Sequence, residues 1–239
     1  NFDLLKKKNL NFLDKFNFDI IINLIALTNI DYCEKHKKIA KKINYEITKK
    51  VTNYCKEKNI KQIFISTDQC YNSSRGFSIE NKIKVLNYYT KTKIMAEQVA
   101  MSVNSVIFRT NFFGYEGGIV KWIVNSCKQK LNIKLIKDIY FSPLHAHTLS
   151  KLILNACENF YPGVYNLGSN GKMSKKDFIL MIFKLLGIKT SYSQVSLKNF
   201  KFLCKRPSDM SMNVKKFEKI YEKRLPLLKN EIKKILLEI

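Results

Sequence analysis

The sequence is poor in the residues that build disulfide frameworks, metal sites and membrane spans. Its 239 residues include six cysteines without any Cys-x-x-Cys pair, only three histidines and a single tryptophan. Scattered cysteines are typical of thiols kept reduced in a cytosol, so neither a disulfide scaffold nor a structural zinc site is expected. No stretch reaches the roughly 18 to 20 uninterrupted apolar residues of a membrane span, and the opening NFDLLKKKNL lacks the apolar core of a signal peptide. We therefore expect a cytoplasmic protein that does not enter a membrane.

The one close pair of histidines is His145 and His147, which could place two imidazoles on one side of an extended segment. A protein metal centre needs at least a third ligand, and the sequence offers none nearby. A polar stretch that opens a helix is the favoured interpretation, and no metal is expected.

Acidic residues are also scarce: 19 Asp and Glu face 43 Lys and Arg, which gives a formal net charge of +24. Such a charge is compatible with nucleic-acid binding, because lysines release counterions from phosphates. Here the lysines are spread over the whole chain rather than gathered in one segment. We therefore expect no specific nucleic-acid recognition, and note that a basic protein also suits a substrate that carries a diphosphate.

The first part of the chain alternates between buried strands and helices. Apolar runs typical of strands buried on both faces occur at 19–26 (DIIINLIA), 62–68 (QIFISTD) and 105–114 (SVIFRTNFFG), and helices are predicted at 34–58, 88–102 and 119–130. With 46% hydrophobic residues the chain can supply a substantial core. This order predicts an α/β fold with a parallel, doubly wound sheet.

After about residue 132 the predicted elements become shorter. We expect helices at 146–159 and 174–186, a strand at 164–169 and a terminal amphipathic helix from Pro226. Ser174 followed by Asp177 resembles a capping box at the start of the second helix. The boundaries predict a first domain over 1–132 and a smaller lobe, interleaved with it, mainly over 133–239.

Three Tyr-x-x-x-Lys pairs occur in the predicted helices: Tyr45 with Lys49, Tyr54 with Lys58, and Tyr89 with Lys93. Side chains at i and i+4 share one face of a helix, so a lysine cation there favours the phenolate and lowers the pKa of the tyrosine. Only the pair at 89 follows a motif, Ser66-Thr67-Asp68, at the carboxyl end of a buried strand, where open α/β sheets bind ligands. The other two pairs are expected to lie on a solvated helix face.

These segments together resemble the extended short-chain dehydrogenase/reductases and, within them, the dTDP-4-dehydrorhamnose reductases. The resemblance runs through FDIIINLIALTNIDYCE, ISTDQCY, YTKTKIMAE, IFRTNFFG, FSPLHAHTLSKLI, VYNLGS and RPSDMSMNVKKF, in order and over nearly the whole chain. It implies a Rossmann-like NAD(P)-binding domain followed by a substrate-binding lobe. The implied cofactor is NADPH or NADH, and the implied partner is a nucleotide-linked sugar, with a homodimer as one option.

The resemblance also implies roles for individual residues. Tyr89 would be the general acid, Lys93 would hold the nicotinamide ribose and tune Tyr89, and Thr67 would orient the substrate carbonyl. The implied cofactor-binding set is Asn23, Leu24, Ile25, Ala26, Ser66, Tyr89, Lys93, Arg109 and Thr110, and the implied substrate-binding set is Thr67, Asp68 and Arg206. Asn44 stands where the superfamily has an asparagine that organises the site.

The chain departs from the family pattern in three places. The first strand and its glycine-rich phosphate loop are not in the sequence, and Asn1 aligns roughly forty residues into a typical member, so we expect an N-terminally truncated chain that aggregates and binds the cofactor weakly. Leu24 and Ile25 replace small alanines and could crowd the cofactor. His147 and Thr148 replace residues that are commonly acidic.

The activity expected from the resemblance is reduction of a nucleotide-linked 4-keto sugar for surface polysaccharides. The Ser-Thr-Asp triplet and the Arg206-Pro207 segment favour a reductase over an epimerase or dehydratase of the same superfamily. A non-catalytic regulatory or binding homologue is a further alternative, against which the retention of Thr67, Tyr89 and Lys93 argues.

Overall fold

A four-stranded parallel sheet forms the centre of the computed structural model, which describes residue 4 and residues 10–238. Its strand order is β1-β2-β3-β8, with β1 at Ile20–Asn23, β2 at Lys61–Thr67, β3 at Ser105–Thr110 and β8 at Gly163–Leu167. In the register, Thr67 lies opposite Thr110, which in turn lies opposite Leu167. The parallel α/β sheet predicted from the alternating elements is confirmed.

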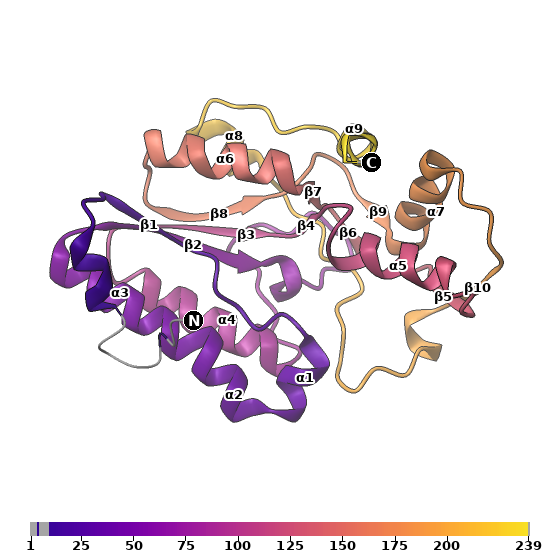
Figure 1. Cartoon of the computed structure of the whole chain (residues 1–239), viewed down its shortest axis with the longest axis horizontal. Helices are drawn as coiled ribbons and strands as arrows, with labels where there is room; N and C mark the ends of the chain where they lie inside the picture. The colour runs from indigo at the N-terminus through magenta and orange to yellow at the C-terminus, as the bar shows by residue number, and fades with distance from the viewer. Residues whose placement is uncertain (1–3, 5–9, 239) are drawn as a thin grey trace.

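Helices cover both faces of this sheet and make three layers (Figure 1). On one face lie α1 (Ile30–Lys35), α2 (Lys37–Lys41), α3 (Ile47–Lys58) and α4 (Tyr88–Ala100), and on the other lie α6 (Ala146–Glu158) and α8 (Lys215–Ile220). Successive side chains of a strand point to opposite faces. Phe64 accordingly packs with Ala96 of α4, whereas its neighbour Ile63 belongs to the core that contains Leu152 of α6.

The helix predicted over 34–58 is not continuous. It begins earlier, with Asn29 accepting a hydrogen bond from the Tyr32 amide as its N-cap, and it is interrupted at His36. A π-helical turn over Lys42–Glu46 then precedes α3. π-turns inside helices are frequent at functional sites, and this one carries the buried Asn44.

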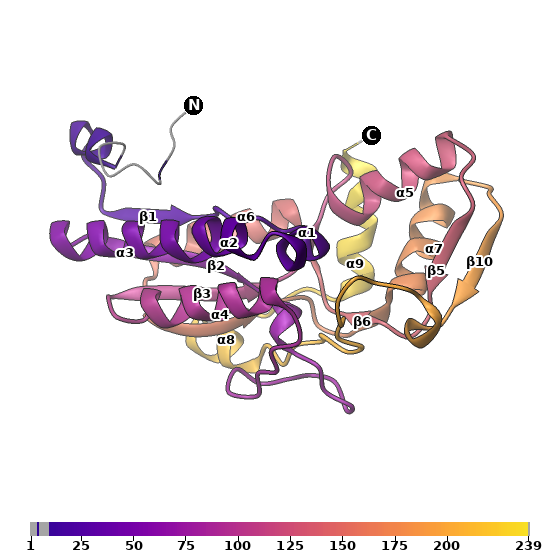
Figure 2. The same cartoon turned by 90° about the horizontal axis from the view of Figure 1, so that it is seen from below.

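A second lobe extends from the carboxyl side of the sheet (Figure 2). It consists of α5 (Gly118–Lys128), α7 (Lys175–Leu186), α9 (Leu228–Lys233), the parallel pair β5 (Ile133–Ile136) and β10 (Tyr192–Val195), and the antiparallel pair β6 (Tyr140–Phe141) and β9 (Met173–Ser174). Its own core includes Ile123, Phe141 and Phe178. The predicted cap of α7 is confirmed, since the Asp177 amide donates to Ser174 Oγ at 3.0 Å.

The remaining elements are short. They are β4 (Phe112–Phe113), which pairs with β7 (Leu144–His145), and the 3-10 turns η2 (Asn11–Lys15), η4 (Asp68–Cys70), η5 (Leu197–Asn199) and η6 (Lys234–Leu237). The chain after residue 132 also contributes to the central sheet and its covering helices. Strand β8 is part of the sheet, and α6 and α8 pack against it.

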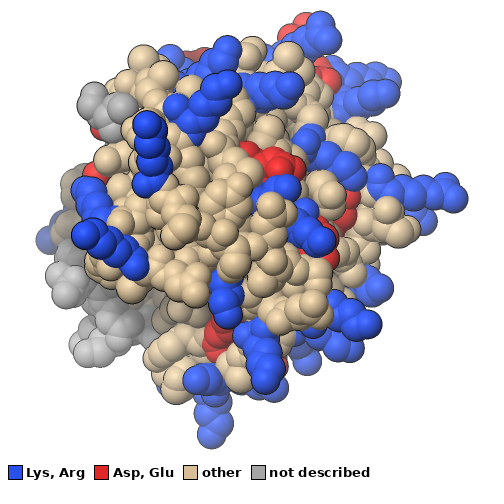
Figure 3. Space-filling view, turned by 90° about the vertical axis from the view of Figure 1, so that its right-hand side faces the viewer, with Lys and Arg blue, Asp and Glu red and all other residues tan. Residues whose placement is uncertain are grey.

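Basic side chains are distributed over the face of the second lobe rather than concentrated on it. Figure 3 shows lysines and arginines separated by uncharged surface, with few acidic groups among them. In the described part of the chain, no helix is both long enough and apolar enough to span a bilayer.

Candidate active site

Tyr89 and Lys93 lie one turn apart near the start of α4, and both are buried against the sheet. The helix begins at Asn87, whose side chain accepts a hydrogen bond from the Thr90 amide at 2.9 Å. Lys93 Nζ donates to the carbonyl oxygen of Ile65 at 2.7 Å and lies 4.1 Å from the centroid of the Phe64 ring. The lysine side chain therefore extends from α4 to the C-terminal part of β2.

Thr67 ends β2 and brings its hydroxyl to the tyrosine. Its Oγ accepts a hydrogen bond from the Gln69 amide at 3.1 Å, which caps η4. The Thr67 side chain also lies close enough to the Tyr89 phenol to lower its pKa, in opposition to the larger effect of burial. The structure thus assembles the predicted trio of Thr67, Tyr89 and Lys93 at the carboxyl end of the sheet.

Burial is the largest influence on the pKa values of Tyr89 and Lys93. It raises the pKa of Tyr89 well above its usual range, against the opposing hydrogen bond from Thr67. It lowers the pKa of Lys93 to about 7, against the attraction of Glu97. The expectation that Lys93 lowers the pKa of Tyr89 is wrong for this structure, because desolvation of the phenol outweighs its favourable contacts. The phenol is consequently held in its protonated, acidic form at neutral pH.

Asn44 fastens three segments of the site together. Its Oδ1 accepts from the Leu27 amide at 2.7 Å, and its Nδ2 donates to the Leu27 carbonyl and to Thr92 Oγ at 3.2 and 3.1 Å. Thr92 in turn donates to the Tyr89 carbonyl at 2.7 Å. The asparagine of the π-turn therefore ties the loop after β1 to the helix that carries Tyr89.

The predicted cofactor segment after β1 is divided between buried and open residues. Asn23 is buried, donating to Thr48 and accepting from the Ile25 amide. Ile25 packs against the cluster that contains Val51 and Tyr54, and Ala26 is partly exposed. Leu24 is 64% exposed, so its side chain points away from the protein interior.

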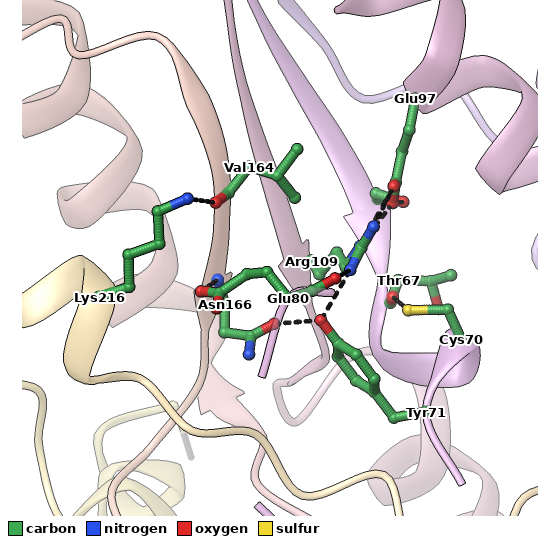
Figure 4. A network of polar contacts seen from close by, with 10 residues as sticks. Thr67, Cys70, Tyr71, Glu80, Glu97, Arg109, Val164, Asn166 and Lys216 are labelled. Atoms are coloured by element: carbon green, nitrogen blue, oxygen red, sulfur yellow. Dashed lines mark hydrogen bonds and ion pairs between the residues drawn. The ribbon is translucent and has the colours of Figure 1, made fainter. Parts of the chain in front are cut away.

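Ser66 and Arg109 both contact Glu97 in a different buried network, of which Figure 4 shows Arg109, Glu97, Tyr71 and Asn166. Arg109 forms a bidentate ion pair with Glu97, with Nη2 to Oε2 at 2.7 Å and Nε to Oε1 at 3.0 Å. Its Nη1 donates to the Tyr71 hydroxyl and the Glu80 carbonyl, and Ser66 Oγ donates to Glu97. These two side chains are occupied within the protein, so the structure does not turn them toward the predicted cofactor site.

Thr110, at the end of β3, is buried, and its hydroxyl makes only a long 3.5 Å contact with the Asn111 carbonyl. Asn111 Nδ2 donates to Asp68 Oδ2 at 2.8 Å. Burial raises the pKa of Asp68 to about 6, opposed by this hydrogen bond and by the charge of Lys175. Asp68 Oδ1 is buried without a hydrogen-bond partner among the described residues.

Arg206 lines a pocket of about 260 Å³ that also contacts Gln69, two residues beyond the end of β2. The pocket is bounded by Thr28 of the loop after β1, by Ile30 at the start of α1, by Gln69 after β2, and by Lys175 and Arg206 of the second lobe. Ile30 also packs with the cluster that contains Tyr89. The pocket therefore borders the cluster that contains Tyr89 and lies between the sheet and the second lobe.

Sequence reasoning missed Lys175 and Glu97 as contributors to this region. Lys175 is the first residue of α7, in a segment where lysine is common and no motif distinguishes it. Glu97 is the glutamate of the quoted YTKTKIMAE segment, at i+4 from Lys93, and that spacing could have revealed it.

The other sequence candidates lie elsewhere. Tyr45 is half-buried beside an exposed Lys49. Tyr54 was expected on a solvated face, which is wrong: it is buried in the cluster with Val51, and its hydroxyl donates to Asp14 at 2.8 Å. His145 is the N-cap of α6, as expected, and its Nε2 pairs with Glu238 at 2.7 Å. No group of three metal-ligating side chains lies within the described residues.

Comparison with known proteins assigns a family to this arrangement. The family model described as "RmlD substrate binding domain" matches residues 1–239. The dTDP-4-dehydrorhamnose reductase of Salmonella typhimurium is 23% identical over 244 aligned residues, which cover 94% of this chain and 81% of that protein. A probable low-salt glycan biosynthesis reductase of Haloferax volcanii is 24% identical over 73% of this chain, which spans 62% of that protein's length.

Solved structures agree with the fold. A dTDP-4-dehydrorhamnose reductase from Clostridium acetobutylicum superposes with a TM-score of 0.92 at 24% identity, covering 99% of this chain and 88% of that one. One from Bacillus anthracis, in complex with NADP, gives 0.93 at 22% identity over 99% and 87%. The match of the family model over the whole chain shows that this protein belongs to the RmlD substrate-binding-domain family.

Proposed function

We propose that this protein is an NAD(P)H-dependent reductase that converts the keto group of a nucleotide-linked 4-keto sugar into an alcohol, in the synthesis of surface polysaccharide sugars. The observation that carries the proposal is the buried trio of Thr67, Tyr89 and Lys93, assembled where β2 ends and α4 begins. The family relatives named as dTDP-4-dehydrorhamnose reductases support the same reaction class.

The side chains are suited to the proton half of a carbonyl reduction. Addition of hydride to the keto carbon leaves a negative charge on the oxygen, which must receive a proton. Burial raises the pKa of Tyr89 and keeps the phenol protonated, and the Thr67 side chain at the end of β2 lies close enough to influence that pKa. Tyr89 then transfers its proton to the developing alkoxide, while Thr67 binds the same oxygen and holds it in place.

The residues around the trio fit a nicotinamide cofactor, which when bound supplies the hydride. An ammonium has three donors, and Lys93 uses one of them on the Ile65 carbonyl, so two are free for the hydroxyls of a ribose. The loop from Leu24 to Ala26 leaves the carboxyl end of β1, where parallel sheets bind dinucleotides. We propose that this loop and Lys93 hold the cofactor.

Asp68 and Arg206 complete the proposal as groups on the substrate side, since Arg206 lines the pocket and Asp68 is next to Gln69, which also lines it. An epimerase or dehydratase of the same superfamily is the alternative within this fold, and a non-catalytic binding homologue is the alternative outside enzymes.

The free state of all six cysteines supports a reducing compartment, and we propose that the protein acts in the cytoplasm without nucleic acid or membrane partners.

The test uses the purified chain with NADPH and dTDP-4-dehydrorhamnose. We expect oxidation of NADPH in step with the appearance of a 4-hydroxy sugar nucleotide, followed by absorbance and by mass spectrometry. Conversion of the keto sugar into an isomer without net consumption of NADPH would identify an epimerase instead. Binding of both ligands with no turnover would favour the non-catalytic homologue.

A further inference from the structure

The short helix α1 contacts both the start of α4 and the second lobe. Its residues Asp31 and Glu34 are three positions apart, so their side chains are neighbours on one side of the helix. Cys33, which lies between them in the sequence, is fully buried and packs in the cluster that contains Tyr89. The helix therefore adjoins the residue that we propose to donate the proton.

Glu34 binds the first turn of α4. Its Oε2 accepts a hydrogen bond from the Tyr88 amide at 2.9 Å, and its Oε1 pairs with Lys37 at 3.2 Å. Tyr88 is the first residue of α4, and the first four amides of a helix have no acceptor within the helix itself. A carboxylate at this position is also favoured by the helix dipole. Glu34 therefore holds the turn that carries the Tyr89 side chain.

Asp31 binds the second lobe. Its Oδ1 accepts a hydrogen bond from Arg206 Nη2 at 2.8 Å, and it accepts a longer contact of 3.7 Å from the Cys204 thiol. Arg206 and Pro207 both line the pocket between the sheet and the second lobe. Asp31 thus fixes the segment 204–207 of the second lobe against the first domain.

A direct contact between α4 and the second lobe closes these links into a ring. Asn87, the N-cap of α4, donates from Nδ2 to the Lys205 carbonyl at 3.1 Å, while its Oδ1 accepts from the Thr90 amide at 2.9 Å. Lys205 directly precedes Arg206, just as Asn87 directly precedes Tyr88. Each link is therefore joined to the next through one peptide bond or through α1. The members of this interlobe ring are Asp31, Glu34, Asn87, Tyr88, Lys205 and Arg206.

We propose that the interlobe ring sets the distance between Tyr89 and the second lobe, and that Asp31 and Glu34 are positioning residues for the proton transfer. Glu34 acts through the backbone of α4, and Asp31 acts through the segment 204–207. The proton donor must lie within hydrogen-bond reach of the substrate oxygen, and a displacement of about 1 Å can cost about a hundredfold in rate. Tyr89 directly follows Tyr88, so a shift of the first turn moves the phenol. This inference rests on the proposed function for the reaction in which Tyr89 acts.

A closed ring predicts that its two carboxylates are coupled. Release of Arg206 from Asp31 loosens the adjoining Lys205, and with it the contact of that carbonyl with the N-cap of α4. Release of Tyr88 from Glu34 loosens the same N-cap from its other side. Each substitution should therefore affect both ends of the ring, whereas two independent contacts would each affect only their own surroundings.

The first experiment is hydrogen–deuterium exchange of the purified chain, which needs neither substrate nor turnover. Asp31→Ala and Glu34→Ala should each raise the exchange of backbone amides in both 88–92 and 204–208. The control is Glu57→Ala, which removes an exposed glutamate of α3 and should leave both segments unchanged. Exchange that rises in each variant only in the segment contacted by the substituted residue would overturn the ring.

The second experiment measures turnover of the same variants with NADPH and dTDP-4-dehydrorhamnose. Glu34→Ala should lower kcat about tenfold or more and raise the solvent deuterium isotope effect, because proton transfer becomes slower, and should leave NADPH affinity unchanged. Glu34→Gln, which keeps an acceptor for the Tyr88 amide, should restore most of kcat. The double variant of Asp31→Ala and Glu34→Ala should lose less than the product of the two single losses.

The outcomes separate this inference from the proposed function. Unchanged kcat in Glu34→Ala, a loss that Glu34→Gln does not restore, or single losses that simply multiply would overturn the positioning role while the proposed function stands. An unaltered chain that binds both ligands without turnover would contradict the proposed function and with it the role in proton transfer. The exchange measurement would then still decide whether the ring couples the two lobes.

Discussion

Two buried polar clusters lie side by side on α4, and they differ in how fully their hydrogen bonds are satisfied. In the Arg109 network, formed by Ser66, Tyr71, Glu97, Arg109 and Asn166, every guanidinium nitrogen has an acceptor, and Tyr71 donates to Asn166 Oδ1 at 2.6 Å. In the trio of Thr67, Tyr89 and Lys93, which we propose to be catalytic, the lysine uses a single acceptor.

The difference separates a structural role from a chemical one. A saturated network in a low-dielectric interior fixes the positions of its members, so Arg109 holds β3, α4 and the segment around Tyr71 together. A buried ammonium with unused donors is costly for folding and gains its partners only when a ligand arrives. We infer that groups with satisfied hydrogen bonds, such as Asn44 and Glu97, hold the trio in position.

The largest loss of stability is expected from a substitution in the Arg109 network. Glu97→Gln leaves the buried Arg109 without its countercharge, which should lower the free energy of unfolding by about 3–5 kcal/mol. Urea denaturation followed by circular dichroism measures it. Glu116→Gln, which removes a glutamate with an 80% exposed side chain from a surface pair with Lys121, is the control and should change stability by less than about 0.5 kcal/mol. Equal losses in the two variants would contradict the account.

A smaller loss of stability is expected at Asn44, which joins the loop after β1 to α4. Asn44→Ala removes the acceptor of the Leu27 amide and a donor to Thr92, and should cost about 1–3 kcal/mol of stability because buried backbone groups lose their partner. It should also lower turnover, since the loop and α4 are no longer joined. A variant with reduced stability but unchanged turnover would show that Asn44 does not position Tyr89.

The pH dependence of stability sharpens the comparison further. Burial lowers the pKa of Lys93 to about 7, so between pH 7 and the ordinary lysine value of 10.5 the unfolded chain holds a proton that the folded chain has released. The unfolding free energy should therefore rise with pH across this window by more in the unaltered protein than in Lys93→Met. Urea midpoints at about pH 7 and pH 9 measure the difference. Parallel changes in both proteins would show that Lys93 is charged throughout.

The smallest effect is expected outside both clusters. Tyr54→Phe removes the hydrogen bond to Asp14 from a well-packed ring, which should cost about 0.5–1.5 kcal/mol and leave turnover unaltered. Thermal melting and steady-state rates on the same sample check both statements. A loss of turnover beyond that of the folded fraction would show that a second Tyr-x-x-x-Lys pair contributes to activity.

Motifs in the sequence predicted the positions of the candidates that depend on local spacing. Thr67, Tyr89 and Lys93 could be placed at a strand end and on one helix face because both patterns can be recognised from the chain itself. The contact of Arg109 with Tyr71 could not be found in this way, because Tyr71 reaches Arg109, and Asn166 reaches Tyr71, only after the sheet has formed. Nor does any pattern show that Tyr54 is covered by the residues near Asp14, or that Lys175 faces the strand end across a cavity.

The same limit applies to the predicted direction of one pKa. The i, i+4 spacing suggested that the Lys93 charge acts on Tyr89, whereas burial of the phenol is the larger influence. Burial depends on everything that packs around α4, including Cys33 and Ala40 from other helices. The spacing of two residues contains no information about that environment.

The most direct test of the central claim is the turnover of Tyr89→Phe, measured together with its melting temperature. The claim is that the buried phenol donates the proton. We therefore predict that Tyr89→Phe lowers kcat by a factor of about 100 or more, the usual scale for loss of a general acid. Its melting temperature should stay close to that of the unaltered protein. Turnover of Tyr89→Phe equal to that of Tyr45→Phe and of the unaltered protein would contradict it.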